Sequence, residues 1–103
     1  MYVLNYWHTV SDYGEWKKAF DGDPLGREAS GVRRLSIERP LDDEHTVIGE
    51  LEFDSLGEAE TFAGRLQEVW KGPAGSMVSD AGSNISEVLV EKELRSETAR
   101  KVA

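Results

Sequence analysis

The chain of 103 residues contains no cysteine, which excludes disulfides, thiolate metal sites and cysteine nucleophiles. Basic residues are also few, because 12 lysines and arginines stand against 20 aspartates and glutamates, for a net charge of −8. This balance argues against binding to nucleic acid or to an anionic membrane surface. The sequence has no apolar run near the roughly 18 residues of a membrane-spanning helix. It also has no basic start followed by an apolar stretch, so we expect no signal peptide and a cytoplasmic location.

What is present suffices for one small domain. Hydrophobic residues make up 39% of the chain and nine aromatic side chains are available for a core. We expect the domain to occupy residues 1–94 and a polar, frayed tail to occupy residues 95–103.

Hydrophobic periodicity predicts four strands and two helices. The expected strands are residues 2–10, 32–39, 46–53 and 84–93, and the expected helices run from about 13 to 21 and from about 56 to 70. Asp12 and Glu15 have the spacing of a capping box at the start of the first helix. The glycine-rich stretch 72–82 is expected to hold at most one helical turn, around residues 76–78.

The order strand-helix-strand-strand-helix-strand is that of the α+β, ferredoxin-like fold, a four-stranded antiparallel sheet with both helices on one face. The first strand is apolar or aromatic on both faces, so the face without helices requires a cover. A second copy of the same sheet would supply it. The sequence therefore predicts a homodimer that encloses a small barrel-like cavity.

The segment His8-Thr9-Val10-Ser11-Asp12-Tyr13-Gly14-Glu15-Trp16-Lys17, with its H-x-V-x-D-Y-x-x-W pattern, runs from the first strand into the first helix. Together with the order and lengths of the elements over residues 2–94, this segment resembles the dimeric α+β barrel superfamily. That superfamily includes antibiotic-biosynthesis monooxygenase-like proteins, haem-degrading monooxygenases and small cyclases or isomerases. The resemblance implies a shared fold and several alternative chemistries.

Haem-degrading members of the superfamily use an asparagine on the first strand, a tryptophan on the second long helix and an iron-ligating histidine shortly after it. Asn5 and Trp70 correspond to the first two, but no histidine follows His45. The resemblance therefore does not extend to haem degradation, and we expect neither a cofactor nor a metal. Cofactor-independent, quinone-forming oxygenases of the group place asparagine and tryptophan around an aromatic substrate, which implies substrate contacts for Asn5, Trp7 and Trp70.

His8 is the candidate catalytic residue, because an imidazole with a pKa near 6.5 can accept a proton from a phenol or an activated C–H group. The alternative is a structural imidazole that hydrogen-bonds the start of the first helix at Asp12 or Tyr13. Arg34 and Glu50 are further candidates for substrate binding, with Arg34 holding a carboxylate or enolate. The alternative for Arg34 is an ion pair with Glu50 or Glu52 across the paired strands.

Two classes of function stay open. The first is a homodimer that binds an apolar or aromatic small molecule and acts as a cofactor-free monooxygenase, or as a cyclase or isomerase. The second is a dimer with a ligand-binding or structural role and no catalysis. Which face of the first strand lines the cavity decides between His8 and Asn5 as its main polar residue.

Overall fold

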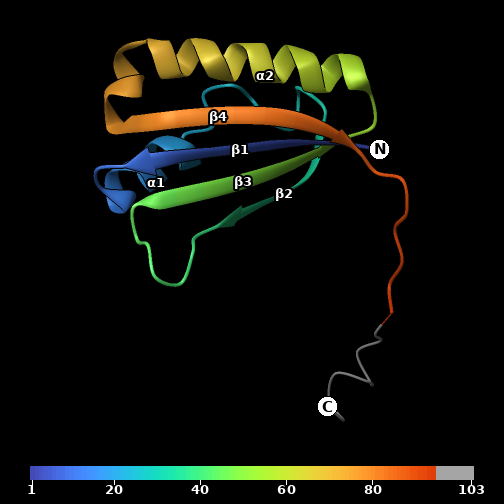
Figure 1. Ribbon diagram of the computed structural model, residues 1–103. Helices are drawn as coiled ribbons and strands as arrows, with labels where there is room; N and C mark the ends of the chain where they lie inside the picture. Colours follow the sequence, from blue (N-terminus) through green and yellow to red (C-terminus); the bar gives the residue numbers. More distant parts are fainter. Residues whose placement is uncertain (95–103) are drawn as a thin grey trace.

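The computed structural model describes residues 1–94, so the predicted tail over residues 95–103 lies outside the described part of the chain. The elements follow in the order β1 (Tyr2–Val10), α1 (Tyr13–Asp21), β2 (Val32–Glu38), β3 (Thr46–Phe53), α2 (Leu56–Lys71), the 3-10 turn η1 (Pro73–Met77) and β4 (Val78–Glu87) (Figure 1). Among residues 1–94, no helix is long and apolar enough to cross a membrane.

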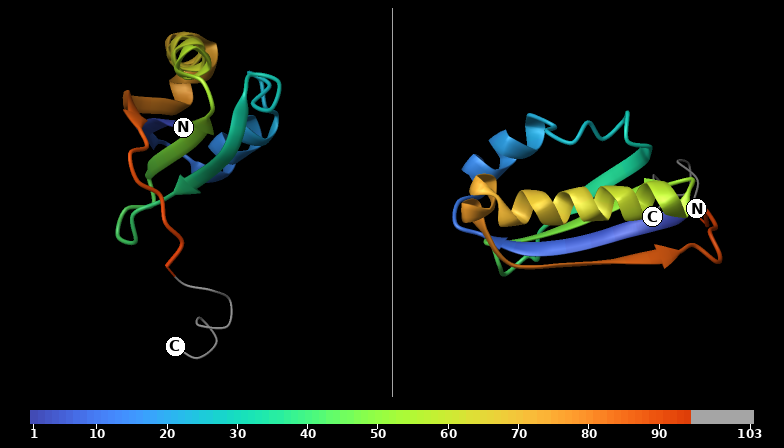
Figure 2. Two further views of the ribbon diagram at one scale, coloured as in Figure 1. Left: turned by 90° about the vertical axis from the view of Figure 1, so that its right-hand side faces the viewer. Right: turned by 90° about the horizontal axis from the view of Figure 1, so that it is seen from above.

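The four strands form one sheet in the order β2-β3-β1-β4, and all neighbours are antiparallel. The predicted ferredoxin-like fold is therefore confirmed. Both helices pack on the same face of the sheet, and the other face is open in the monomer (Figure 2).

The helices begin where their capping residues predict. The Asp12 side chain accepts a hydrogen bond from the backbone N–H of Glu15 at 3.1 Å, and Ser55 accepts one from the backbone N–H of Glu58 at 3.3 Å. These side chains pair N–H groups that the first turn of each helix leaves without partners. Gly22 and Gly72 follow the last residues of α1 and α2.

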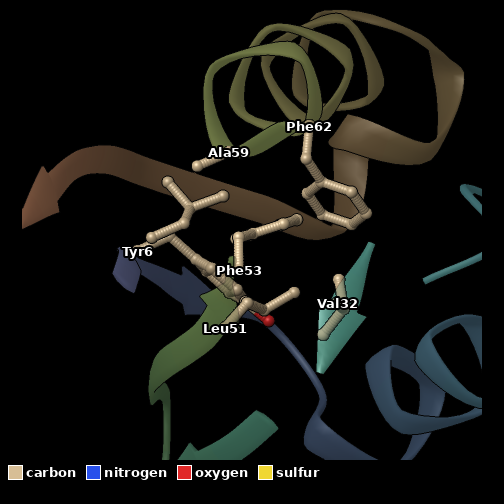
Figure 3. Close-up of a cluster of buried hydrophobic side chains, with 7 residues drawn as sticks. Tyr6, Val32, Leu51, Phe53, Ala59 and Phe62 are labelled. Atoms are coloured by element: carbon tan, nitrogen blue, oxygen red, sulfur yellow. The ribbon is translucent and has the colours of Figure 1, made fainter. Parts of the chain in front are cut away.

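The core lies between the helices and the even-numbered side of β1. Its larger cluster joins the sheet to α2 and consists of Leu4, Tyr6, Val32, Leu51, Phe53, Ala59 and Phe62 (Figure 3). A smaller cluster of Val10, Trp16 and Val47 joins the sheet to α1. The aromatic residues of α1 are also part of the core, with Trp16 buried and Tyr13 and Phe20 packed beside it.

β4 differs from the prediction, because it spans Val78–Glu87 rather than residues 84–93. The residues that precede position 84 have no strand-like apolar alternation, but they pair with β1 from Val10↔Val78 onward. The register shifts between Trp7 and Thr9, close to Asp80, which has a positive φ of 53°. After Glu87 the chain leaves the sheet, and the Val88 N–H donates to the Met1 carbonyl at 3.0 Å (Figure 1).

Candidate functional site

A cavity of about 120 Å³ lies between the helices and the buried face of the sheet. Its wall is mostly apolar and includes Trp16, Phe20, Leu51, Phe62, Leu66 and Trp70. Four polar side chains also line it, namely Tyr6, His8, Asp23 and Arg27. A concave apolar space with a few converging polar groups has the character of a small-molecule site.

The alternation of β1 directs Tyr6 and His8 into this space, because residues two apart share a face of a strand. Tyr6 lies opposite Gly49 of β3 in the register, and a Cβ atom at position 49 would lie 2.3 Å from the Tyr6 ring. The absence of a side chain at Gly49 therefore allows the Tyr6 ring to lie across β3.

His8 sits among three aromatic rings. Its ring centroid is 5.7 Å from that of Tyr6, in a stacked arrangement, 5.6 Å from that of Trp16, and 6.0 Å from that of Trp70, edge to face. Strand β1 and both helices thus hold the imidazole in place. Aromatic pairs at these separations contribute about 1 kcal/mol each beyond their buried area.

The His8 imidazole is buried and neutral at pH 7. Its residue is only 3% exposed, and burial lowers the pKa of His8 from 6.5 to about 4. Its Nδ1 atom is buried without a hydrogen-bond partner among residues 1–94, so the predicted alternative of a bond from that atom to Asp12 or Tyr13 is not observed. Buried polar atoms are nearly always paired, so the unpaired nitrogen of His8 is an exception that a functional role would explain.

Besides His8 and Asp23, the polar groups of the cavity are Tyr6 and Arg27. Burial raises the pKa of the Tyr6 hydroxyl to about 12, against the opposing effect of the Arg27 charge, so Tyr6 stays a neutral hydrogen-bonding group. Arg27 lies on the loop between α1 and β2, and its guanidinium lies 3.9 Å from the centroid of the Phe20 ring. Its Nη1 donates to the Phe20 carbonyl at 3.0 Å.

The six site residues predicted from the sequence do not form one site. His8 and Trp70 line the cavity, whereas Asn5, Trp7, Arg34 and Glu50 belong to the open face. The physical reason is the two-residue period of β1, which sends Asn5 and Trp7 to the side opposite His8. Asn5 therefore does not join Trp70 in one pocket of the protomer, as the resemblance to quinone-forming oxygenases implied.

The open-face residues contact one another. Asn5 Nδ2 donates to Asn84 Oδ1 and to Ser86 Oγ, both at 3.0 Å. Arg34 Nε pairs with Glu52 Oε2 at 3.3 Å, which is the ion pair predicted as the alternative to substrate binding.

Glu50 accepts a long hydrogen bond of 3.4 Å from Ser36 Oγ. Its pKa is raised, chiefly by the hydrogen bond that it shares with Glu38 and then by desolvation.

Sequence reasoning did not identify Arg27 and Phe20 as residues of the site. Phe20 has the helical spacing of a core residue, and Arg27 follows a run of helix-breaking residues that gives no indication of a pocket. The adjacent Gly26 has a positive φ of 59°, a feature that only the structure shows.

No protein-family model matches the chain, and no curated protein matches it either. Solved structures do match. The haem degrader MhuD of Mycobacterium tuberculosis, with two haems bound in its active site, has 18% identity and a TM-score of 0.66, with 90% of this chain and 100% of that chain covered.

A candidate antibiotic biosynthesis monooxygenase of Deinococcus radiodurans has 11% identity and a TM-score of 0.71. The match covers 93% of this chain and 100% of that chain. A dimeric ferredoxin-like protein from an uncultured marine organism has 18% identity and a TM-score of 0.61. The match covers 90% of this chain and 99% of that chain. These similarities confirm the predicted resemblance at the level of the fold.

Proposed function

We propose that this protein binds a small aromatic molecule with one polar group in the cavity between the helices and the sheet. The observation that carries the proposal is His8, a buried imidazole that lines an otherwise apolar cavity and whose Nδ1 has no hydrogen-bond partner among residues 1–94. A ligand whose polar atom reached this nitrogen would supply the missing hydrogen bond. The rings of Tyr6, Trp16 and Trp70 would contact the apolar part of the ligand.

The volume of the cavity limits the ligand to about one ring. An apolar cavity of roughly 150 Å³ accommodates benzene, and this cavity measures about 120 Å³. A phenol matches both the size and the single polar group. A macrocycle such as haem is far larger, so the proposal includes no haem and needs no cofactor.

The same arrangement supports a cofactor-independent monooxygenase as the catalytic form of the proposal. A phenol and dioxygen give a para-quinone and water: one oxygen atom joins the ring, the other leaves as water, and the phenol supplies all the electrons. His8 would accept the phenolic proton, because it is neutral at pH 7. The phenolate formed beside it would raise the pKa of His8 by favouring the charged imidazole.

Calorimetric titration of the purified protein with phenol tests the binding proposal. We expect saturable binding that is at least tenfold weaker in His8→Phe, which keeps the ring but removes the nitrogen atoms. Asn5→Ala is expected to bind as the wild type does, because Asn5 lies on the opposite face. Equal loss in both variants, or no binding to a folded wild-type protein, would overturn the proposal.

Oxygen consumption separates the catalytic form from a binding protein. With a saturating phenol, dioxygen uptake and one equivalent of quinone per phenol are expected from an enzyme. If phenol binds and dioxygen is not consumed, the protein is a ligand-binding module and the monooxygenase form is wrong.

We also propose that the protein is a homodimer assembled through the open face of its sheet. Trp7 is 40% exposed at the centre of that face, next to the partly buried Ile48. Leu89, Val90 and Leu94 are exposed on the extended segment after β4, where no strand of residues 1–94 pairs with them. A second copy would cover both surfaces, and one structural neighbour is itself a dimeric ferredoxin-like protein.

A further inference from the structure

We propose that Arg27 and Tyr6 form an anion-binding subsite in the wall of the cavity, and that the preferred ligand is therefore a one-ring aromatic carboxylate. This inference rests on the proposed binding function and adds a substrate class to it. Nothing in the sequence pattern alone pointed to Arg27.

The Arg27 side chain is held in a fixed position. Its backbone N–H donates to Asp23 Oδ1 at 2.9 Å, its Nη1 donates to the Phe20 carbonyl at 3.0 Å, and its Nε lies 3.4 Å from Asp23 Oδ1. The guanidinium also lies 3.9 Å from the Phe20 ring centroid. A planar guanidinium held by several contacts loses little entropy when it binds a carboxylate.

These contacts leave donors for a ligand. Arg27 has five N–H donors on its guanidinium, and within residues 1–94 its Nη2 makes no hydrogen bond. The side chain is only 20% exposed, so a carboxylate bound to it is partly shielded from water. Charge-assisted hydrogen bonds are stronger than neutral ones in such a setting.

Asp23 only partly neutralises the charge of Arg27. The ion pair between them is long, at 3.4 Å, and the Asp23 side chain is 39% exposed to solvent, which screens its charge. Asp23 Oδ1 is moreover directed toward the Arg27 backbone N–H. Because Asp23 lines the same cavity, an anion would be held by hydrogen bonds from the guanidinium and not by a net positive charge of the cavity.

Tyr6 provides the second contact of the subsite. Its residue is 5% exposed and lines the same cavity, and the Arg27 charge acts on its hydroxyl. Because both residues line the same cavity, the Tyr6 hydroxyl would donate to one carboxylate oxygen of the ligand while Arg27 Nη2 donates to the other. The aromatic ring of the ligand would then extend toward His8 and Trp70, so that a hydroxyl on the far side of the ring would reach His8.

The other arginines described below do not combine a largely buried guanidinium with a place in the cavity wall. Arg33 and Arg34 form ion pairs with Asp54 and Glu52 and have largely exposed side chains. Arg65 donates to Ser30 Oγ and does not line the cavity. Among residues 1–94, Arg27 is the guanidinium in the cavity wall.

The test compares benzoate with benzamide, its neutral analogue of nearly the same shape, and with phenol, by calorimetry at pH 7. We expect benzoate to bind at least tenfold more tightly than benzamide. Arg27→Gln should abolish this preference, Arg27→Lys should keep part of it, and Tyr6→Phe should reduce it several-fold. Arg65→Gln is the matched control and should keep the full preference.

The outcomes separate this inference from the proposed function. If phenol or benzamide binds in the cavity and benzoate binds no more tightly than benzamide, the anion subsite is wrong and the binding function stands. If a folded wild-type protein binds none of the three compounds, both are wrong. If Arg27→Gln fails to fold by circular dichroism, the Arg27→Lys and Tyr6→Phe variants decide, and an unchanged preference in both would overturn the subsite.

Discussion

The ring of Tyr6 lies directly over Gly49, its partner in the antiparallel pairing of β1 and β3. A Cβ atom at position 49 would approach two ring atoms of Tyr6 to 2.3 Å. On the other face of the sheet, Trp7 lies over Gly82 of β4 in the same way, with a Cβ at 2.6 Å. Two consecutive aromatic residues thus lie across glycines on opposite faces, one toward the cavity and one toward the open surface.

Gly49→Ala should disturb the cavity by displacing Tyr6. The added methyl group overpacks a buried contact, and we expect a loss of about 2 kcal/mol in the free energy of unfolding. The matched control is Gly64→Ala, because Gly64 is an exposed position of α2 with no atom within 4 Å of its Cβ position. Gly64→Ala should raise stability by about 1 kcal/mol, through helix propensity alone. Urea denaturation measures the free energy of unfolding of both variants. Equal changes in the two variants would contradict the Tyr6–Gly49 contact.

Stability should fall with decreasing pH because of His8. Its pKa is near 6.5 when unfolded and about 4 in the folded protein, so between these values the unfolded state binds the proton more strongly. His8 is then protonated mainly on unfolding, and the stability present above pH 6.5 is lost as the pH falls toward 4. Between pH 7 and pH 5, the wild type should lose about 2 kcal/mol more than His8→Gln, which does not titrate. Parallel pH profiles for the two proteins would show that His8 is not a buried neutral imidazole.

Trp70 should limit the size of the ligand. It closes the cavity from the end of α2, 6.1 Å from Tyr6 and 6.0 Å from His8 between ring centroids. In the wild type, phenol should bind more tightly than 2-naphthol. Trp70→Leu enlarges the cavity, and we expect this order to reverse as phenol loses ring contacts and the second ring finds space. An unchanged order of affinities would place the ligand elsewhere.

Trp7 should be essential to the proposed homodimer. Trp7→Glu adds a charge at the centre of the open face, close to Glu50, and should convert the dimer to a monomer. Leu41→Glu is the control, since Leu41 is fully exposed in the turn between β2 and β3. Sedimentation velocity at low micromolar concentration distinguishes the two states. A monomeric wild type, or a Trp7→Glu variant that stays dimeric, would show that this face is not the interface.

Much of the fold could be predicted because local sequence and packing agree. Residues 46–53 alternate between apolar and polar except at Ile48, which predicted the full length of β3, and Asp12 with Glu15 predicted the start of α1. β4 could not be predicted in the same way. Its first half has polar and small residues, and only pairing with β1 makes it a strand. Residues 88–90 have strand-like composition, but within residues 1–94 they have no neighbouring strand.

The site was harder to predict than the fold. β1 is aromatic on both faces, so sequence alone left His8 and Asn5 as alternatives, and the packing of the two helices selected the face with His8. Arg27 reaches the cavity through a loop in which Asp23 and Gly26 both have positive φ angles. Such a turn depends on backbone geometry that hydrophobic periodicity does not encode.

Nitrogen NMR of the histidine rings during a titration with phenol tests the central claim most directly. The protein has two histidines, and His45 is an internal control because its exposed ring contacts the Val10 carbonyl outside the cavity. We expect the His8 ring nitrogens to shift on binding, as Nδ1 gains a hydrogen-bond partner, while the His45 signals stay unchanged. Saturation with phenol that leaves the His8 signals unmoved would contradict the claim that this cavity is the binding site.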